Sequence, residues 1–117
     1  MARQLCVSRI VFGAGLILAP TMYARFWAGP GASERWSRVL ARSLGARELA
    51  LGGGGLAALR SGDDAATAWM LANAATEAAD VVVNLAVGPR TPGRLVGAAM
   101  AAANTAVLGA WLAERRG

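Results

Sequence analysis

The chain has 117 residues, enough for one domain over 1–117, and hydrophobic residues make up 56% of it against 16% charged. This composition lies well to the apolar side of ordinary soluble domains. It favours a small polytopic membrane protein over a soluble, alanine-rich helical bundle. The net charge of +5 is carried by arginines that are scattered rather than gathered in one basic stripe. We therefore expect membrane lipid, and no nucleic acid, as the partner.

Two apolar helices are expected in the first half of the chain. The first covers about 5–22, and aromatic residues typical of a membrane interface follow it. We interpret it as a retained first span, because no convincing signal-peptide cleavage site follows. A Gly-Pro-Gly stretch at 29–31 breaks the helix, and Ser33 is a candidate N-cap for a second helix over about 34–59. That helix begins amphipathic and turns apolar from Leu44.

Two further helices are expected in the second half. The turn at 61–64 precedes a helix over about 65–87, with Asp63 or Asp64 as its cap. The stretch 88–93, with two prolines and two glycines, is the clearest break, and a helix over about 94–112 follows. No alternating pattern indicates a strand. Four helices with short connections predict an all-α fold, a four-helix transmembrane bundle with up-down-up-down topology.

The third predicted helix carries a polar stripe. Polar side chains recur at steps of four, three and four residues, at Asn73, Glu77, Asp80 and Asn84. These steps return to one helix face, which other helices must cover in so apolar a chain. Burial and mutual proximity raise the proton affinity of a carboxylate pair, so Glu77 and Asp80 are candidate acid and base. The alternative is that they pair with arginines and lock the bundle.

Three residues of this helix are candidates for ligand binding. Asn73 and Asn84 lie in the stripe and offer hydrogen bonds to a substrate oxygen or to the carboxylates. Trp69 lies one turn before Asn73 on the same face and can wall a pocket for an apolar ligand. For Trp69 we favour the alternative, an anchor at the membrane interface.

The second predicted helix supplies partners for these carboxylates. Small or acidic residues recur at steps of three, four and three, at Gly45, Glu48, Gly52 and Gly55. Glycines at this spacing let another helix approach closely, so we expect a smooth packing face with one carboxylate in it. We expect Arg47 to point to the other side of this helix. A phosphate-binding glycine loop is disfavoured, because no Lys-Ser/Thr ending follows and no strand precedes the run.

The remaining candidates are basic residues and one cysteine. We expect Arg9 of the first helix to turn inward and meet Glu77 or Asp80, rather than reach for lipid headgroups. The residues that can orient the acid and base or stabilise an anion are Arg9, Arg42, Arg47 and Glu48. Cys6 is the single cysteine and histidine is absent, so the sequence predicts no metal site and no cofactor. Cys6 is interpreted as a packed apolar residue.

Several short motifs follow one another along the chain: Arg9-Ile10 with Gly13 and Pro20, Arg42-x-x-Gly45-x-Arg47-Glu48-x-x-Leu51-Gly52, Trp69, and the Glu77/Asp80 pair. Together they resemble small actinobacterial four-helix integral membrane proteins of unknown function. The resemblance implies a fold and no settled activity, and members usually carry Asp where this chain has Glu48 and Glu77. The small multidrug resistance transporters are a weaker likeness. Their key carboxylate lies in the first helix, where this chain has Arg9.

Three functions agree with these patterns. We favour a small multi-pass protein of the cell inner membrane, with a buried Arg/carboxylate network that binds a lipophilic ligand or a partner helix. The second is an intramembrane acid/base enzyme, such as an isomerase, a cyclase or an epoxide-opening catalyst, acting on a lipophilic substrate. The third is a proton-coupled small-molecule carrier. A homodimer or larger membrane complex is expected for the carrier, because four short helices enclose little volume.

Overall fold

The computed structural model describes residues 1–30, 35–87 and 91–116, and the described chain is helical, without strands. Its helices are α1 (Ala2–Leu18), α2 (Pro20–Ala28), α3 (Arg35–Ser61), α4 (Asp63–Val87) and α5 (Pro92–Arg116). The predicted all-α class is confirmed. The candidate cap Ser33 and part of the predicted break at 88–93 lie outside the described residues. Asp63 and Asp64, expected as caps, form the first turn of α4.

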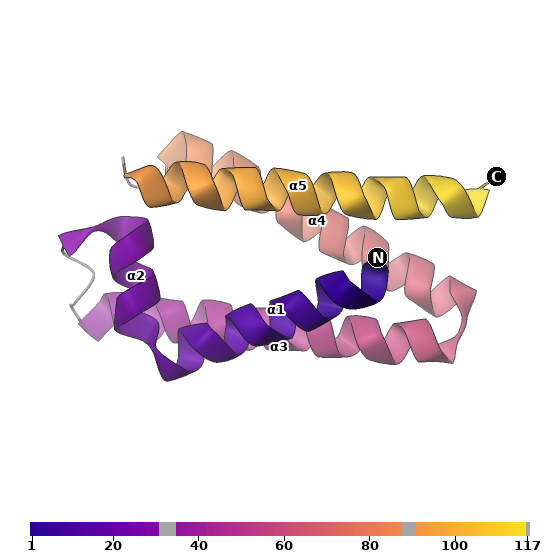
Figure 1. Cartoon of the computed structure of the whole chain (residues 1–117), viewed down its shortest axis with the longest axis horizontal. Helices are drawn as coiled ribbons and strands as arrows, with labels where there is room; N and C mark the ends of the chain where they lie inside the picture. Colours follow the sequence, from indigo (N-terminus) through magenta and orange to yellow (C-terminus); the bar gives the residue numbers. More distant parts are fainter. Residues whose placement is uncertain (31–34, 88–90, 117) are drawn as a thin grey trace.

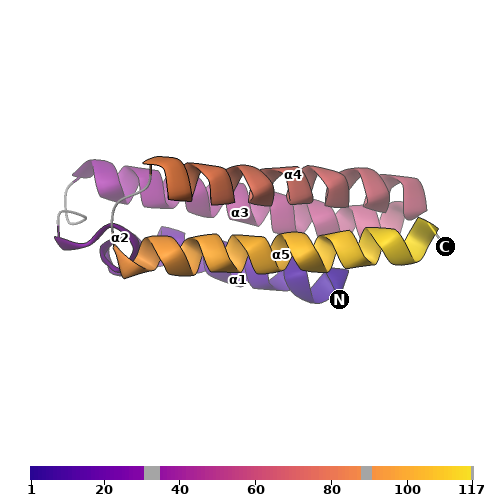
Figure 2. The same cartoon turned by 90° about the horizontal axis from the view of Figure 1, so that it is seen from above.

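The long helices α1, α3, α4 and α5 run along the longest dimension of the molecule, and α2 crosses it at one end (Figure 1). Successive long helices run in opposite directions, so both chain termini lie toward the end where α3 turns into α4 (Figure 2). α1 packs mainly on α3, and α4 mainly on α5. The molecule is therefore built from two helix pairs, joined by contacts of α3 with α4 and of α5 with α1 and α2.

A sharp bend separates α1 from α2, whereas the sequence predicted one helix over 5–22. The helix axis changes direction by 104° at a break between Leu18 and Pro20. Proline disfavours the helical conformation for the residue before it, and Ala19 accordingly has φ −130° and ψ 59°. Pro20 then takes the first position of α2, where its missing N–H has no helical partner to lose.

Glycines bring α1 and α3 into backbone contact. A Cβ added at Gly13 would lie 2.6 Å from the carbonyl oxygen of Gly45, and one added at Gly52 would lie 2.6 Å from that of Cys6. Both distances are shorter than real Cβ contacts, so a larger residue at either position forces the helices apart. On α3 the residues Gly45, Glu48, Gly52 and Gly55 are all buried. The predicted packing face with an embedded carboxylate is confirmed.

Two apolar clusters fill the interior on either side of Arg9. The larger is formed by residues of α1, α4 and α5 and includes Cys6, Met70 and Leu108, each with 0% exposure. Cys6 is thus a packed apolar residue, as predicted. The smaller cluster gathers Leu16 of α1 with residues of α2 and α3 near the bend. Between the clusters, the interior is polar.

Candidate functional site

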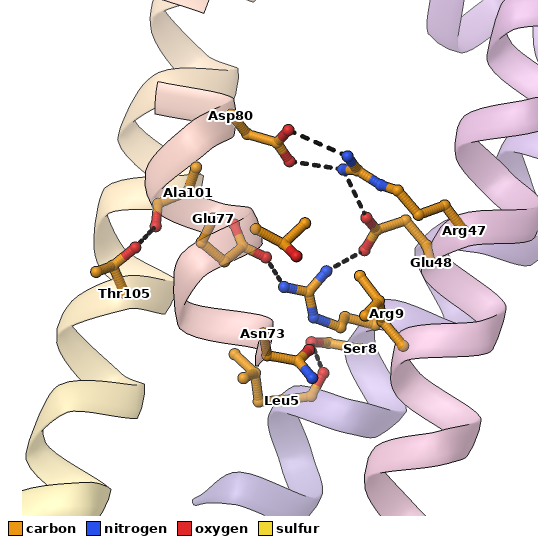
Figure 3. Close-up of polar contacts among 12 residues, drawn as sticks. Leu5, Ser8, Arg9, Arg47, Glu48, Asn73, Glu77, Asp80, Ala101 and Thr105 are labelled. Atoms are coloured by element: carbon orange, nitrogen blue, oxygen red, sulfur yellow. Dashed lines mark hydrogen bonds and ion pairs between the residues drawn. The ribbon is translucent and has the colours of Figure 1, made fainter. Parts of the chain in front are cut away.

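Charged side chains of α1, α3 and α4 form one continuous series of ion pairs, in the order Glu77, Arg9, Glu48, Arg47, Asp80 (Figure 3). We call these five residues the ion-pair network. The Arg9 guanidinium donates from Nη1 to Glu48 Oε2 at 2.5 Å, and its Nη2 pairs with Glu77. Arg47 donates to both oxygens of Asp80, at 2.6 and 3.2 Å, and from Nη2 to Glu48 Oε1 at 3.2 Å. The network therefore links three helices through two shared guanidinium groups.

Helix spacing explains why these residues meet. Glu77 and Asp80 are three positions apart, so both project from the same side of α4. Arg9 lies between Cys6 and Gly13, the two positions where α1 touches the backbone of α3, and the close approach brings it against Glu48. No Cα atoms of α1 and α4 come within 8 Å in the described ranges. Arg9 thus reaches Glu77 across a gap that only long side chains span.

Burial in the network falls from one end to the other. The side chains of Arg9, Glu48 and Glu77 are 3%, 7% and 6% exposed, so solvent is excluded around them. The side chains of Arg47 and Asp80 are 38% and 30% exposed. A buried charge is costly unless a partner of opposite sign accompanies it. Each of the three buried groups in the network has at least one partner of opposite charge.

The network holds three carboxylates and two guanidinium groups. When all five groups are ionised, one negative charge is therefore left without a counter-charge inside the network. The half-exposed Asp80 forms the end of the network that solvent reaches.

Asn73 lies one turn before Glu77, with 0% exposure, and its side chain points from α4 toward Arg9 (Figure 3). Its Nδ2 donates to the carbonyl oxygen of Trp69 at 2.9 Å. Within the described chain, Asn73 Oδ1 and Arg9 Nε are buried and have no hydrogen-bond partner. One free acceptor and one free donor match the needs of a small hydroxyl group or a buried water.

Two arginines behave differently from the prediction. Arg47 does not point away from the site: its long side chain extends from α3 toward α4 and reaches Asp80 (Figure 3). Arg42 lies outside the network, exposed, and its Nε donates to the carbonyl oxygen of Ile17 at 3.3 Å. Arg42 therefore helps to hold α3 against the end of α1 and has no contact with the carboxylates.

Two of the three candidate ligand-binding residues hold helices together. The Nε1 of Trp69 donates to the carbonyl oxygen of Leu51 at 3.0 Å, which fixes α4 against the glycine-rich part of α3. Asn84 Oδ1 accepts a hydrogen bond of 2.8 Å from Trp27 Nε1, which joins α2 to α4. Sequence reasoning missed the contact between Trp27 and Asn84. The two residues are 57 positions apart, and no helical spacing relates them. Of the three, Asn73 is the residue beside the network.

The described residues contain no group of three or more His, Cys, Asp or Glu side chains placed to hold a metal ion. The carboxylates that come nearest to such a group already face arginines.

A family model described as "Domain of unknown function (DUF4267)" matches residues 6–112. The chain belongs to this family. The match includes all five network residues, and the expected membership of a family of unknown function is confirmed to that extent. No curated protein and no solved structure matches the chain. The function must therefore be argued from the geometry of the molecule.

Proposed function

We propose that this protein is a small multi-pass protein of the cell inner membrane that binds a lipophilic ligand or a partner helix. Its ion-pair network would hold the two helix pairs together within the bilayer. The observation that carries the proposal is that charged side chains are buried while large apolar side chains are exposed. Arg9 is 3% exposed, whereas Leu18 is 82% and Trp36 is 74% exposed. Soluble proteins rarely bury charge and expose large apolar side chains in this way, but a lipid environment favours both.

Helix length and composition support crossing of the membrane. α5 has 25 residues and is long and apolar enough to span, and α1 with α2 forms a bent pair that passes the same test. Only 22% of the apolar stretch of α5 is buried inside the molecule, unlike the core helix of a soluble protein. The longest dimension is 47 Å, against about 40–45 Å for a bilayer with its headgroups. In this proposal α3 and α4 cross as well, because the network pairs their charges.

The ion pairs favour a role in ligand binding or helix assembly over a role in catalysis. Arg9 and Arg47 contact their carboxylates directly, so the centre of the network leaves no room for a substrate between acid and base. Beside it, Asn73 Oδ1 and Arg9 Nε are buried without hydrogen-bond partners in the described chain, and these are the polar atoms with which a ligand would bond. The exposed apolar faces of the helices offer the area that a partner helix or a lipophilic molecule requires.

Membrane fractionation tests the proposal. The protein, expressed with a small tag, should remain in the membrane pellet after washing with alkaline carbonate and should require detergent for extraction. Native mass spectrometry of the extracted protein should show a retained lipid-like molecule or a stoichiometric partner. Recovery of a folded, monodisperse protein from the soluble fraction without detergent would refute the membrane location.

The charge imbalance of the network favours a second candidate, an intramembrane acid/base enzyme acting on a lipophilic substrate. Three carboxylates against two guanidinium groups leave a place for one transferable proton, and Asp80 is half-exposed at the outer end. Asp80→Asn would then abolish turnover while the purified protein stays folded. Unchanged turnover in this variant would exclude Asp80 as the group that transfers the proton.

A further inference from the structure

A groove lies along the outer face of α1, in the corner formed with α2. Its volume is about 900 Å³, and its walls include Val7, Val11 and Phe12 of α1 and Tyr23 of α2. Small-molecule sites occupy about 300–1,000 Å³, so the groove is large enough for one ligand. The bend of 104° between α1 and α2 forms this corner and places Tyr23 against Phe12.

Polarity changes along the groove from one end to the other. Arg3 lies at the N-terminal end and forms no ion pair within the described ranges. Val7 and Val11 follow, 44% and 66% exposed. Tyr23 closes the far end, where its ring packs edge-on against Phe12 at 5.6 Å between centroids. Gln4 and Ser8 also line the groove, near its Arg3 end. The groove thus has a cationic, polar end and an apolar remainder, which complement a molecule with one anionic end and a hydrocarbon body.

The length of the groove agrees with one leaflet of a bilayer. Nine helical steps separate Arg3 from Phe12, or about 14 Å at about 1.5 Å per residue. Half of the hydrocarbon core of a bilayer is about 15 Å. With Arg3 at the level of the headgroups, an acyl chain laid along Val7 and Val11 would therefore end near Phe12. A partner helix does not by itself combine an anionic group at the level of Arg3 with an apolar body that ends near Phe12.

We propose that this groove holds one anionic phospholipid, with its phosphate against Arg3 and one acyl chain along Val7, Val11 and Phe12. The proposal rests on the membrane location argued above and names the lipophilic ligand of that function. An arginine near an anionic membrane surface contributes about 1 kcal/mol, which corresponds to about a fivefold preference for the anionic lipid.

The full-length protein, reconstituted in vesicles of equal parts phosphatidylglycerol and phosphatidylcholine, tests the proposal. After mild detergent extraction, native mass spectrometry measures which lipid stays bound. Arg3→Gln should lower the ratio of retained phosphatidylglycerol to phosphatidylcholine by about fivefold. Arg60→Gln is the matched control, because Arg60 is also exposed, in the last turn of α3, and does not line the groove. It should leave the ratio unchanged.

A second pair of variants tests the apolar wall. Val11→Trp should fill the groove and reduce retention of both lipids, whereas Val82→Trp, at a position 65% exposed on α4, should not. Equal effects of Arg3→Gln and Arg60→Gln, or full retention in Val11→Trp, would overturn the proposal. So would a dimer that Val11→Trp dissociates, because a second copy would then occupy the groove. If the wild type stays in the membrane but shows no lipid preference, the groove assignment fails while the membrane location stands.

Discussion

Replacing Arg9 by methionine tests the energetic role of the network. Methionine keeps an unbranched side chain as far as the position of Nε, so the change removes the guanidinium group and its charge. Glu48 and Glu77 would then face each other with side chains only 7% and 6% exposed, where water cannot replace the lost partner. Removal of one member of a buried ion pair costs about 3–5 kcal/mol. Because Arg9 serves two carboxylates, we expect a loss near the upper end, about 5 kcal/mol.

Glu77→Gln should cost much less than Arg9→Met. It leaves two carboxylates against two guanidinium groups, so the charge count of the network becomes balanced. The glutamine carbonyl oxygen can still accept a hydrogen bond from Arg9 Nη2. We therefore expect a loss of about 1 kcal/mol, the net value of an ordinary hydrogen bond.

Reversible unfolding in mixed micelles, with increasing fractions of a denaturing detergent, measures these free energies. Arg42→Met is the matched control, because Arg42 is exposed and bonds only to the carbonyl oxygen of Ile17. Its expected cost is at most about 1.5 kcal/mol. Equal losses for Arg9→Met and Arg42→Met would refute the reasoning, because the network would then contribute no more than a surface contact. A loss in Glu77→Gln as large as that in Arg9→Met would refute the charge argument.

Two further predictions concern helix contacts. Gly13→Ala places a Cβ 2.6 Å from a carbonyl oxygen of α3 and should destabilise by about 1–3 kcal/mol in the same unfolding assay. Gly53→Ala meets nothing within 4 Å and should stabilise α3 by about 0.5–1 kcal/mol. A gain of stability in both variants would contradict the close packing at Gly13. Asn84→Ala removes the bond to Trp27 and should speed hydrogen exchange in α2, whereas Thr76→Ala, with its local bond on α4, should not. Unchanged exchange in α2 would show that this bond does not hold the helix.

The periodic features of the chain were predictable from its sequence. Asn73, Glu77 and Asp80 repeat at helical spacing, which was enough to place them on one covered face and to pair the stripe with Arg9. The glycines around Glu48 likewise predicted the face on which α1 lies. Both features are local, because the helix geometry alone decides which positions share a side.

The side-chain directions were not predictable in the same way. Arg47 is adjacent to Glu48, and helix geometry directs neighbouring positions to different sides. Its long, flexible side chain nevertheless reaches Asp80, which lies on another helix. Arg42 was grouped with the site for its charge, but its position near the bend leaves it beside Ile17.

The bend before Pro20 also escaped the sequence analysis. Proline near the end of an apolar run agrees equally with the last turn of one helix and with the first position of the next. The choice depends on where the following segment can pack, and here α2 lies against α3 and α5. Such a contact between distant parts of the chain cannot be predicted from the spacing of apolar residues.

The division of the network between the two helix pairs sets an order for its assembly. Both guanidinium groups and Glu48 belong to the half of the chain that leaves the ribosome first, and Glu77 and Asp80 arrive later. Among the network residues, the nascent first half therefore has two guanidinium groups and one carboxylate until α4 docks. A translation product that stops at the turn after α3 therefore lacks Glu77 and Asp80 and leaves the network incomplete.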